Sequence, residues 1–135
     1  MKLLPDTNVL IYDTVEDSEY HSTASEIVDK ATQIFVPSIV IHEYLWVILR
    51  LLQAPLSIIE VKLRDYLEDP RTVYVLESVD VLVNALNMLA EDKQDVKEIN
   101  DYIILSTARK YNLMLATFDK KLRKIAINRN VKVIP

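Results

Sequence analysis

Hydrophobic and polar positions along the chain follow two periods, and their alternation predicts strands separated by helices. Short apolar runs typical of buried strands lie between polar or turn residues, at 2–5, 34–37, 72–76, 113–117 and 131–134. Apolar residues at helical spacing predict helices from residue 7 or 8 onward and over 20–33, 38–52, 55–68, 78–90, 99–111 and 120–128. Strands that alternate with helices imply right-handed crossovers and a parallel sheet with helices on both faces.

The expected fold is therefore α/β, with a central parallel sheet of about five short strands flanked by helices. A chain of 135 residues, half of them apolar, fits a single domain over residues 1–135 with a real core. Ser38 is expected to cap the helix over 38–52, and Pro55 suits the first turn of the next helix. Repeats, low-complexity tracts and linkers are absent from the sequence.

Two residue types are missing from the composition, glycine and cysteine. Without glycine, left-handed turn positions need another residue, and Asn112 and Asn130 follow helical patterns where such a position is expected. Glycine-rich phosphate loops and nucleophile elbows are excluded. Without cysteine, disulfides and thiolate metal sites are excluded, which fits the cytosol.

Membrane segments are not predicted. The apolar stretch at residues 3–5 is far too short for a signal peptide, and acids follow it at once. The best candidate for a span, 44–52, is interrupted by Arg50 and falls short of the roughly 20 apolar residues required. We therefore expect a cytoplasmic protein without a membrane partner.

Charge is distributed unevenly. Residues 109–135 hold eight basic residues and one acid, so the overall charge of −4 conceals a basic end beside an acidic body. The cations expected to contact a polyanion's phosphates are Lys120, Lys121, Arg123 and Lys124. For the charge run taken alone, a solvated helix face is the simpler explanation.

Acidic residues follow two of the predicted strands. Asp6 comes directly after the first apolar run, and Asp119 comes after the run that ends at Thr117. Ligands of open α/β sheets bind at the carboxyl ends of the strands, so these acids are expected to share one crevice. Glu43 and Asp101 fall where their helices can reach the same crevice, and four acids at one point need a cation between them.

Clustered carboxylates predict a site for Mg²⁺ or Mn²⁺, which prefer oxygen ligands. Two such ions can activate a water and stabilise the leaving oxygen of a phosphodiester. Taken singly, each acid has a simpler explanation; Asp119, for example, is also a natural N-cap for the helix that follows it. His42-Glu43 begins like a zinc-protease motif, but Trp46 replaces the second histidine.

The ordered set of these motifs resembles the PIN-domain ribonucleases, and most closely their VapC-like toxin branch. The motifs, which span the whole chain, are Asp6-Thr7-Asn8, Glu43 in the helix after Ser38, Asn100-Asp101-Tyr102-Ile103-Ile104 leading to Thr107-Ala108, and Thr117-Phe118-Asp119. Two departures are modest. Pro5 replaces a usual strand residue, so the first ladder is expected to end early, and Asn112 stands where many relatives have glycine.

The resemblance implies a three-layer sandwich and cleavage of single-stranded RNA. It implies that Asp6, Asp101 and Asp119 ligate Mg²⁺ or Mn²⁺ directly, and that Glu43 ligates a second ion or acts through water. Asn8 and Thr117 match polar positions that hold the acids and a water. Glu98 is a further acid, better explained as an exposed helix-start residue. The resemblance also implies a homodimer and an antitoxin protein whose tail lies beside the acids.

Three other functions stay open at the level of sequence. The chain fits an RNA-maturation nuclease of the same fold, or a catalytically silent module that binds RNA or protein. An aspartyl-phosphate phosphatase also has an aspartate at the end of its first strand. Those phosphatases usually carry another acid two residues later, and here that residue is Asn8.

Overall fold

The computed structural model describes all 135 residues and contains one five-stranded parallel sheet. Its strands are β1 (Lys2–Pro5), β2 (Gln33–Pro37), β3 (Thr72–Val75), β4 (Met114–Ala116) and β5 (Val133–Ile134). Their order across the sheet is β3-β2-β1-β4-β5, and every neighbouring pair is parallel. The predicted α/β fold with a parallel sheet of about five short strands is confirmed.

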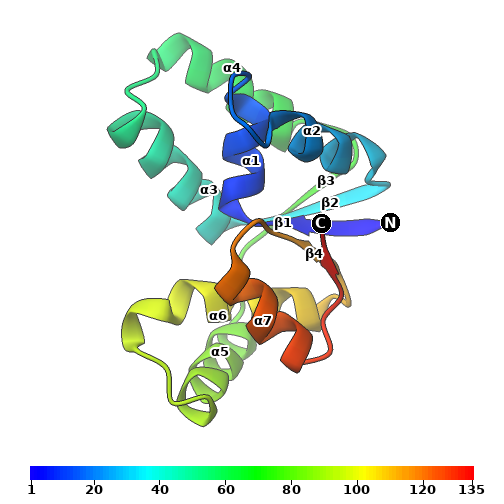
Figure 1. The fold of residues 1–135 in the computed structure, drawn as a ribbon, viewed down its shortest axis with the longest axis vertical. Coiled ribbons are helices and arrows are strands. Elements are labelled where there is room, and N and C mark those ends of the chain that lie inside the picture. The colour runs from blue at the N-terminus through cyan, green and yellow to red at the C-terminus, as the bar shows by residue number, and fades with distance from the viewer.

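Helices cover both faces of this sheet. They are α1 (Thr7–Thr14), α2 (His21–Lys30), α3 (Ser38–Trp46), α4 (Leu56–Leu67), α5 (Val79–Glu91), α6 (Ile99–Lys110) and α7 (Lys120–Asn128). In Figure 1, α1, α2 and α4 lie on one side of the sheet, and α5, α6 and α7 lie on the other. The layers are therefore helix, sheet and helix, as the expected three-layer sandwich requires. No helix is both long and apolar enough to cross a bilayer.

Several predicted boundaries differ from the observed ones. The helix expected over 38–52 is α3 followed by η1, a π-helical segment at Val47–Leu51. The helix expected over 20–33 ends at Lys30, because Gln33 already pairs with Lys2 in the sheet. The acidic stretch 91–98 contains a 3₁₀ turn, η2 (Val96–Glu98), and the last strand is shorter than expected.

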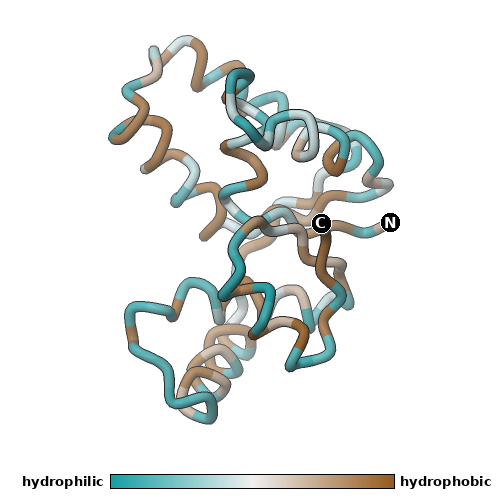
Figure 2. The backbone as a smooth tube through the Cα atoms, viewed as in Figure 1, coloured by the Kyte–Doolittle hydropathy of each residue, from teal (hydrophilic) through white to brown (hydrophobic).

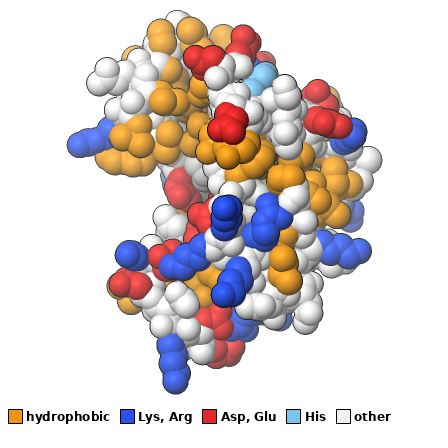
Figure 3. All heavy atoms as spheres, viewed as in Figure 1, with side chains coloured by type: hydrophobic (Ala, Val, Ile, Leu, Met, Phe, Trp, Pro, Cys, Tyr) orange, Lys and Arg blue, Asp and Glu red, His pale blue; other side chains and the backbone are white.

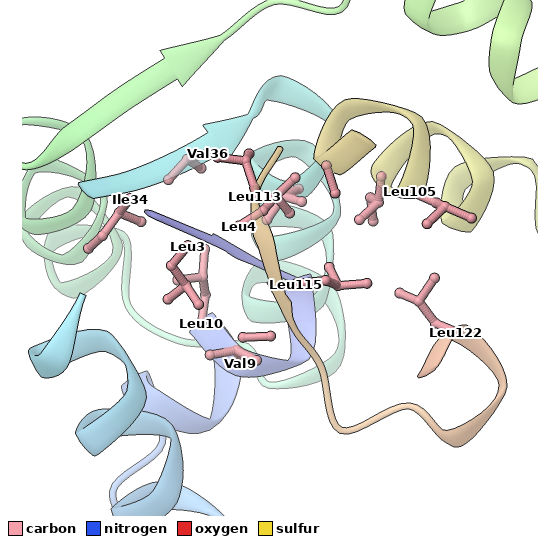
Figure 4. Close-up of a cluster of buried hydrophobic side chains, with 14 of the residues drawn as sticks. Leu3, Leu4, Val9, Leu10, Ile34, Val36, Leu105, Leu113, Leu115 and Leu122 are labelled. Carbon is pink, nitrogen blue, oxygen red and sulfur yellow. The ribbon is translucent and has the colours of Figure 1, made fainter. Parts of the chain in front are cut away.

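The core is built on the central strand β1. Leu3 and Leu4 are fully buried, and they point to opposite faces because strand side chains alternate. Figure 4 shows Leu3 beside the side chains of α1, whereas Leu115 of β4 points towards Leu105 and Leu122 on the other face. Figure 2 shows hydrophobic residues along the strands and also along several of the helices. The carboxyl ends of β1 and β4 are thus held by packing on both sides.

Left-handed backbone occurs at four residues, none of which is glycine. Asn112 and Asn130 have φ of 52° and 62°, as predicted from their positions after helices. Gln53 and Lys93 have φ of 51° and 52°, and no sequence pattern identified them.

The expected early end of the first ladder is wrong for the pairing of β1 with β4, whereas the ladder of β1 with β2 does end early, at Leu3 and Ile34. Pro5 pairs with Ala116, and Asp6 N donates a hydrogen bond of 2.8 Å to Ala116 O. The ring of Pro5 removes only its own N–H, and the ladder bond at this point uses the N–H of the next residue. Strand pairing with β4 therefore continues up to the candidate site residue Asp6.

The predicted capping role of Ser38 is also wrong. Glu77, which follows β3, accepts the Ile39 N–H at 2.9 Å and the Ser38 hydroxyl at 2.5 Å. A carboxylate satisfies an open helix N-terminus better than a hydroxyl does, because its charge also complements the helix dipole. The N-terminus of α3 is thereby tied to the segment that leads into α5.

Candidate active site

Asp6 and Asp119 lie next to each other because they leave adjacent parallel strands. β1 and β4 pair through Leu3, Leu4 and Pro5, so the two chains reach the same edge of the sheet together. The connections of β1 and β4 leave towards opposite sides, which makes this edge the switch point where α/β sheets bind ligands. The two acids thus meet at the strand ends where the shared crevice is expected.

A relay of hydrogen bonds connects the two strand ends. Thr117 Oγ1 donates to Asp6 Oδ2 at 2.8 Å and accepts the backbone N–H of Asp119 at 3.0 Å. Asp6 Oδ1 accepts the Thr7 N–H at 2.8 Å. Asn8 Oδ1 accepts the backbone N–H of Phe118 at 3.3 Å. Thr117 therefore contacts both acids directly, whereas Asn8 holds the backbone at Phe118 between them. The roles that the resemblance implies for these two polar residues stay predictions.

Asp6 is a buried carboxylate, with 7 % of its surface exposed. Burial raises its pKa, and the negative charge of Asp119 raises it further. The hydrogen bonds from Thr117 and Thr7 act in the opposite direction. Each Asp6 oxygen accepts one hydrogen bond and keeps a lone pair available for another partner.

Glu43 and Asp101 bring two further carboxylates from the second turn of α3 and the first turn of α6. Burial raises the pKa of Glu43 to about 7, with a contribution from the charge of Asp6. Burial also raises the pKa of Asp101 to about 7, followed by the charges of Asp6, Asp119, Glu98 and Glu43. The four predicted acids are therefore close enough for their charges to affect one another's pKa values, and Glu98 adds a fifth negative charge.

These carboxylates suit a divalent cation chemically, although their oxygens do not converge on one point. No three His, Cys, Asp or Glu side chains form a ready-made metal-ligand group. Glu43 Oε1 is buried without a hydrogen-bond partner, as is Thr7 Oγ1. The Thr7 hydroxyl is near enough to lower the Glu43 pKa slightly, but the two groups miss hydrogen-bonding geometry.

Asp119 has a structural role as a helix cap. Its Oδ1 accepts the N–H groups of Lys121 and Leu122 at 2.8 and 3.1 Å, so it is the N-cap of α7. The simple explanation for this acid is thus correct, and it is compatible with a second role. The Oδ2 atom takes no part in the cap, and the residue as a whole is exposed.

The basic residues of α7 are of three kinds. Lys121 forms an ion pair of 2.8 Å with Glu98, so part of its charge is neutralised. Arg123 donates to the carbonyl oxygens of Thr117 and Pro135 and is fixed against the backbone. Lys120 and Lys124 are exposed and form no ion pair. In Figure 3, Asp and Glu side chains lie in the hollow between the two halves of the molecule, with Lys and Arg side chains beside it.

The two histidines lie outside the acidic group. His21 Nδ1 donates to Tyr12 O at 2.9 Å, and His42 is exposed on α3. A cavity of about 530 Å³ also lies away from the acids, at the amino ends of β1 and β4, where Met1, Lys2, Asn112 and Met114 contribute to its lining. Sequence reasoning missed the Glu98–Lys121 pair and the aromatic rings that surround Phe118, because both depend on long-range contacts.

Comparison with known proteins identifies the family. The family model described as "PIN domain" matches residues 3–128. No curated protein matches the chain.

Solved structures with the same fold include VapBC2 from Rickettsia felis bound to a promoter DNA fragment. It is 20 % identical, with a TM-score of 0.70 over 99 % of this chain and 98 % of that one. Mycobacterium tuberculosis VapC20, a sarcin-ricin loop cleaving toxin, is 16 % identical, with a TM-score of 0.74 over 90 % and 93 %. FitAcB from Neisseria gonorrhoeae is 18 % identical, with a TM-score of 0.64 over 98 % and 96 %.

Proposed function

Because the chain belongs to the PIN domain family, we propose that it is a divalent-metal-dependent endoribonuclease that cleaves single-stranded RNA. The observation that carries this proposal is the meeting of Asp6 and Asp119 at the ends of adjacent strands, within electrostatic reach of Glu43 and Asp101. Such a carboxylate group suits a phosphodiester hydrolase, because it gathers cations where a polyanion would otherwise be repelled.

Each acid has a distinct role in this proposal. Asp6, Asp101 and Asp119 hold Mg²⁺ or Mn²⁺ directly, Asp6 through oxygens already oriented by Thr117 and Thr7. The chemistry that the cation supplies when bound is activation of water and stabilisation of charge on phosphate oxygens. Glu43, with a pKa of about 7 and an unpartnered Oε1, is suited to orient a water or accept its proton near neutral pH, or to hold a second ion.

The basic side chains of α7 attract the phosphates of the substrate to the side of the molecule that holds the acids. Lys120 and Lys124 are exposed and form no ion pair, so they are available for phosphate contacts that depend on salt but not on sequence. Lys121 and Arg123 contribute charge from fixed positions, through the ion pair with Glu98 and the bonds to the backbone. These cations lie on the helix that Asp119 caps, so the phosphates they attract come next to the acids.

The proposed biological role is that of the toxin in a toxin-antitoxin pair. Support comes from the full-length likeness to VapBC2 and FitAcB and from the likeness to VapC20, a toxin by its description. A protein partner and a homodimer also fit the exposed apolar side chains at the far ends of α3 and α4, namely Trp46, Leu49, Leu51, Leu52, Leu56 and Ile58. Figure 3 shows hydrophobic side chains gathered over that end of the molecule.

The nuclease proposal is tested with purified protein and end-labelled single-stranded RNA, with Mg²⁺, Mn²⁺ or EDTA. We expect cleavage only with a divalent cation, and a loss of more than about 100-fold in Asp6→Asn. Asp80→Asn, an exposed acid at the start of α5, is the matched control and should cleave normally. Full activity in EDTA, or in Asp6→Asn, would contradict the proposal.

The toxin role is tested separately by inducing the chain in bacteria, with and without the protein encoded by the neighbouring gene. Arrest of growth that needs Asp6 and is relieved by the neighbour's product supports a toxin. Cleavage in vitro without any arrest favours the RNA-maturation role. Neither cleavage nor cation binding at millimolar Mn²⁺ would favour a silent binding module.

A further inference from the structure

Three aromatic rings from different parts of the chain form a cluster beside the acids. Tyr12 belongs to α1, Tyr20 precedes α2, and Phe118 lies between β4 and α7. The Tyr20 and Phe118 ring centroids are 5.1 Å apart at an interplanar angle of 32°, and Tyr12 lies 5.1 Å from Tyr20 and 5.2 Å from Phe118. Each ring neighbours the other two, so the three form one aromatic cluster.

The backbone fixes this cluster relative to the carboxylates. Phe118 lies between Thr117, which donates to Asp6, and Asp119, which caps α7. The Phe118 N–H donates to Asn8 Oδ1 at 3.3 Å, and Asn8 is one helical turn before Tyr12 on α1. The same strand end therefore presents an acid and an aromatic ring as neighbours, and the distance between them is set by covalent geometry and the hydrogen-bond relay.

The cluster is only partly used in packing. Tyr20 is 41 % exposed, whereas Tyr12 and Phe118 are half-buried behind it. The hydrogen bonds of the two tyrosines use backbone atoms, from His21 Nδ1 to Tyr12 O and from Tyr20 N to Ser18 Oγ. Tyr44 and Tyr66 differ, since their rings are buried and their hydroxyls bond within the core. Tyr20 is thus the exposed member of the cluster, with its ring against those of Tyr12 and Phe118.

Basic residues follow Phe118 in the sequence, on α7. Lys120 and Lys124 are exposed on α7, and Arg123 donates to Thr117 O at 3.1 Å, next to Phe118 in sequence. In Figure 3, hydrophobic side chains lie directly beside Lys and Arg side chains on the visible face. Aromatic rings beside a basic groove are the combination that binds single-stranded nucleic acids, with bases on the rings and phosphates on the cations.

We propose that Tyr20, supported by Phe118 and Tyr12, forms a stacking site for one unpaired nucleobase of the RNA substrate. The site rests on the proposed function in that its ligand is RNA. A base on Tyr20 brings its strand to the carboxylates and the α7 cations, so the stacked base determines which phosphodiester reaches the acids. Stacking needs a flat π-face more than a particular base edge, so the site selects unpaired over paired RNA.

The test measures RNA binding without cleavage. Uridine octamers, each with 2-aminopurine at a different position, are titrated with the protein in EDTA at low salt, and fluorescence reports stacking on an aromatic ring. We expect binding to quench the 2-aminopurine fluorescence. An octamer of abasic residues should bind about 5- to 100-fold more weakly, the range of one stacked base. Binding without quenching, or equal affinity for the abasic octamer, would overturn the proposal.

Protein variants locate the site. Tyr20→Leu keeps an apolar side chain but removes the ring, so it should lose the quenching. Its affinity for RNA should fall by the same factor by which wild type binds the abasic RNA more weakly. Tyr20→Phe keeps the ring and should bind normally. Tyr74→Leu, an exposed tyrosine on the edge strand β3, is the matched control and should leave quenching unchanged. Normal quenching with Tyr20→Leu would overturn the assignment.

The experiments distinguish failure of the stacking site from failure of the proposed nuclease function. RNA that stacks on Tyr20 but is not cleaved with Mn²⁺ would remove the nuclease activity and leave the base site. RNA that is cleaved equally well by wild type and Tyr20→Leu, with the same positional preference, would remove the base site and leave the nuclease. Because the abasic comparison uses wild-type protein, it decides the question even if Tyr20→Leu folds poorly.

Discussion

The Thr117 hydroxyl donates a hydrogen bond of 2.8 Å to Asp6 Oδ2 across the gap between two strands, and it thereby orients a buried carboxylate. The same hydroxyl accepts the backbone N–H of Asp119. One side chain thus determines the separation of the two acids that the strands bring together, and it lowers the pKa of Asp6 against the effect of burial.

Replacing Thr117 with valine should weaken cation binding without unfolding the protein. Valine keeps the shape but loses the hydrogen bond, so the Asp6 pKa rises and its Oδ2 is no longer held. We expect Mn²⁺ affinity at pH 7 to fall by about 10- to 100-fold, as for other residues that orient metal ligands. Titration calorimetry measures this change, and Thr117→Ser should recover most of the affinity. Equal affinity in all three proteins would exclude an orienting role.

The stability of the metal-free protein should fall as pH rises from about 5 to 7.5. The folded-state pKa values of Glu43 and Asp101 are raised to about 7, from ordinary values of 4.5 and 3.8. In this window the folded state binds more protons than the unfolded state, so the free energy of unfolding decreases with pH. Asp69 and Asp92, whose pKa values are lowered, are already ionised throughout and do not contribute.

Urea unfolding in EDTA at several pH values measures this dependence. The variant Glu43→Gln, combined with Asp101→Asn, should show a much flatter profile over the same range. A wild-type profile that rises with pH would contradict the raised pKa values.

Removing the charge of Asp101 should stabilise the metal-free protein and impair cation binding. At pH 7.5 Asp101 is ionised against Asp6, Asp119, Glu98 and Glu43, so Asp101→Asn relieves repulsion and should raise the melting temperature in EDTA by a few degrees. The same variant should gain little further stability from millimolar Mn²⁺, whereas wild type gains as the ion binds its folded state. Thermal unfolding with and without Mn²⁺ measures both effects. A variant less stable than wild type in EDTA would indicate a structural role for this carboxylate.

Glu77 should stabilise α3 and, through it, the position of Glu43. Glu77→Ala removes the acceptor of two hydrogen bonds at the helix N-terminus and should cost about 1–2 kcal/mol of unfolding free energy. Glu60→Ala, an exposed acid in α4, should cost less than about 0.5 kcal/mol. Chemical denaturation provides both values. An equal cost for the two variants would show that the cap contributes no more than an ordinary surface charge.

The sequence identified local features well and long-range partners poorly. Asp6 and Asp119 were recognisable because apolar runs end directly before them, and the turns at Asn112 and Asn130 because a helix pattern ends there. Strand order was not predictable, so the adjacency of β1 and β4 became known only from the structure. The individual catalytic roles of the acids stay predictions until cation binding and cleavage are measured.

The features that sequence reasoning missed depend on contacts between distant segments. Ser38 looked like a helix cap, but Glu77 takes that role from the next strand end. The Tyr20–Phe118 contact joins residues far apart in the sequence, and no periodicity encodes it. The left-handed conformations of Gln53 and Lys93 are imposed by the surrounding fold, since neither residue type favours them.

A backbone without a single glycine restricts how this protein can respond to its ligands. Glycine supplies the hinges that let many enzymes close over a substrate, and here each left-handed turn is made by a residue with a side chain. We therefore expect the carboxylate side chains to rotate when a cation binds, while the backbone stays in place. Catalytic readiness in this molecule is then a matter of side-chain rotamers rather than of lid movement.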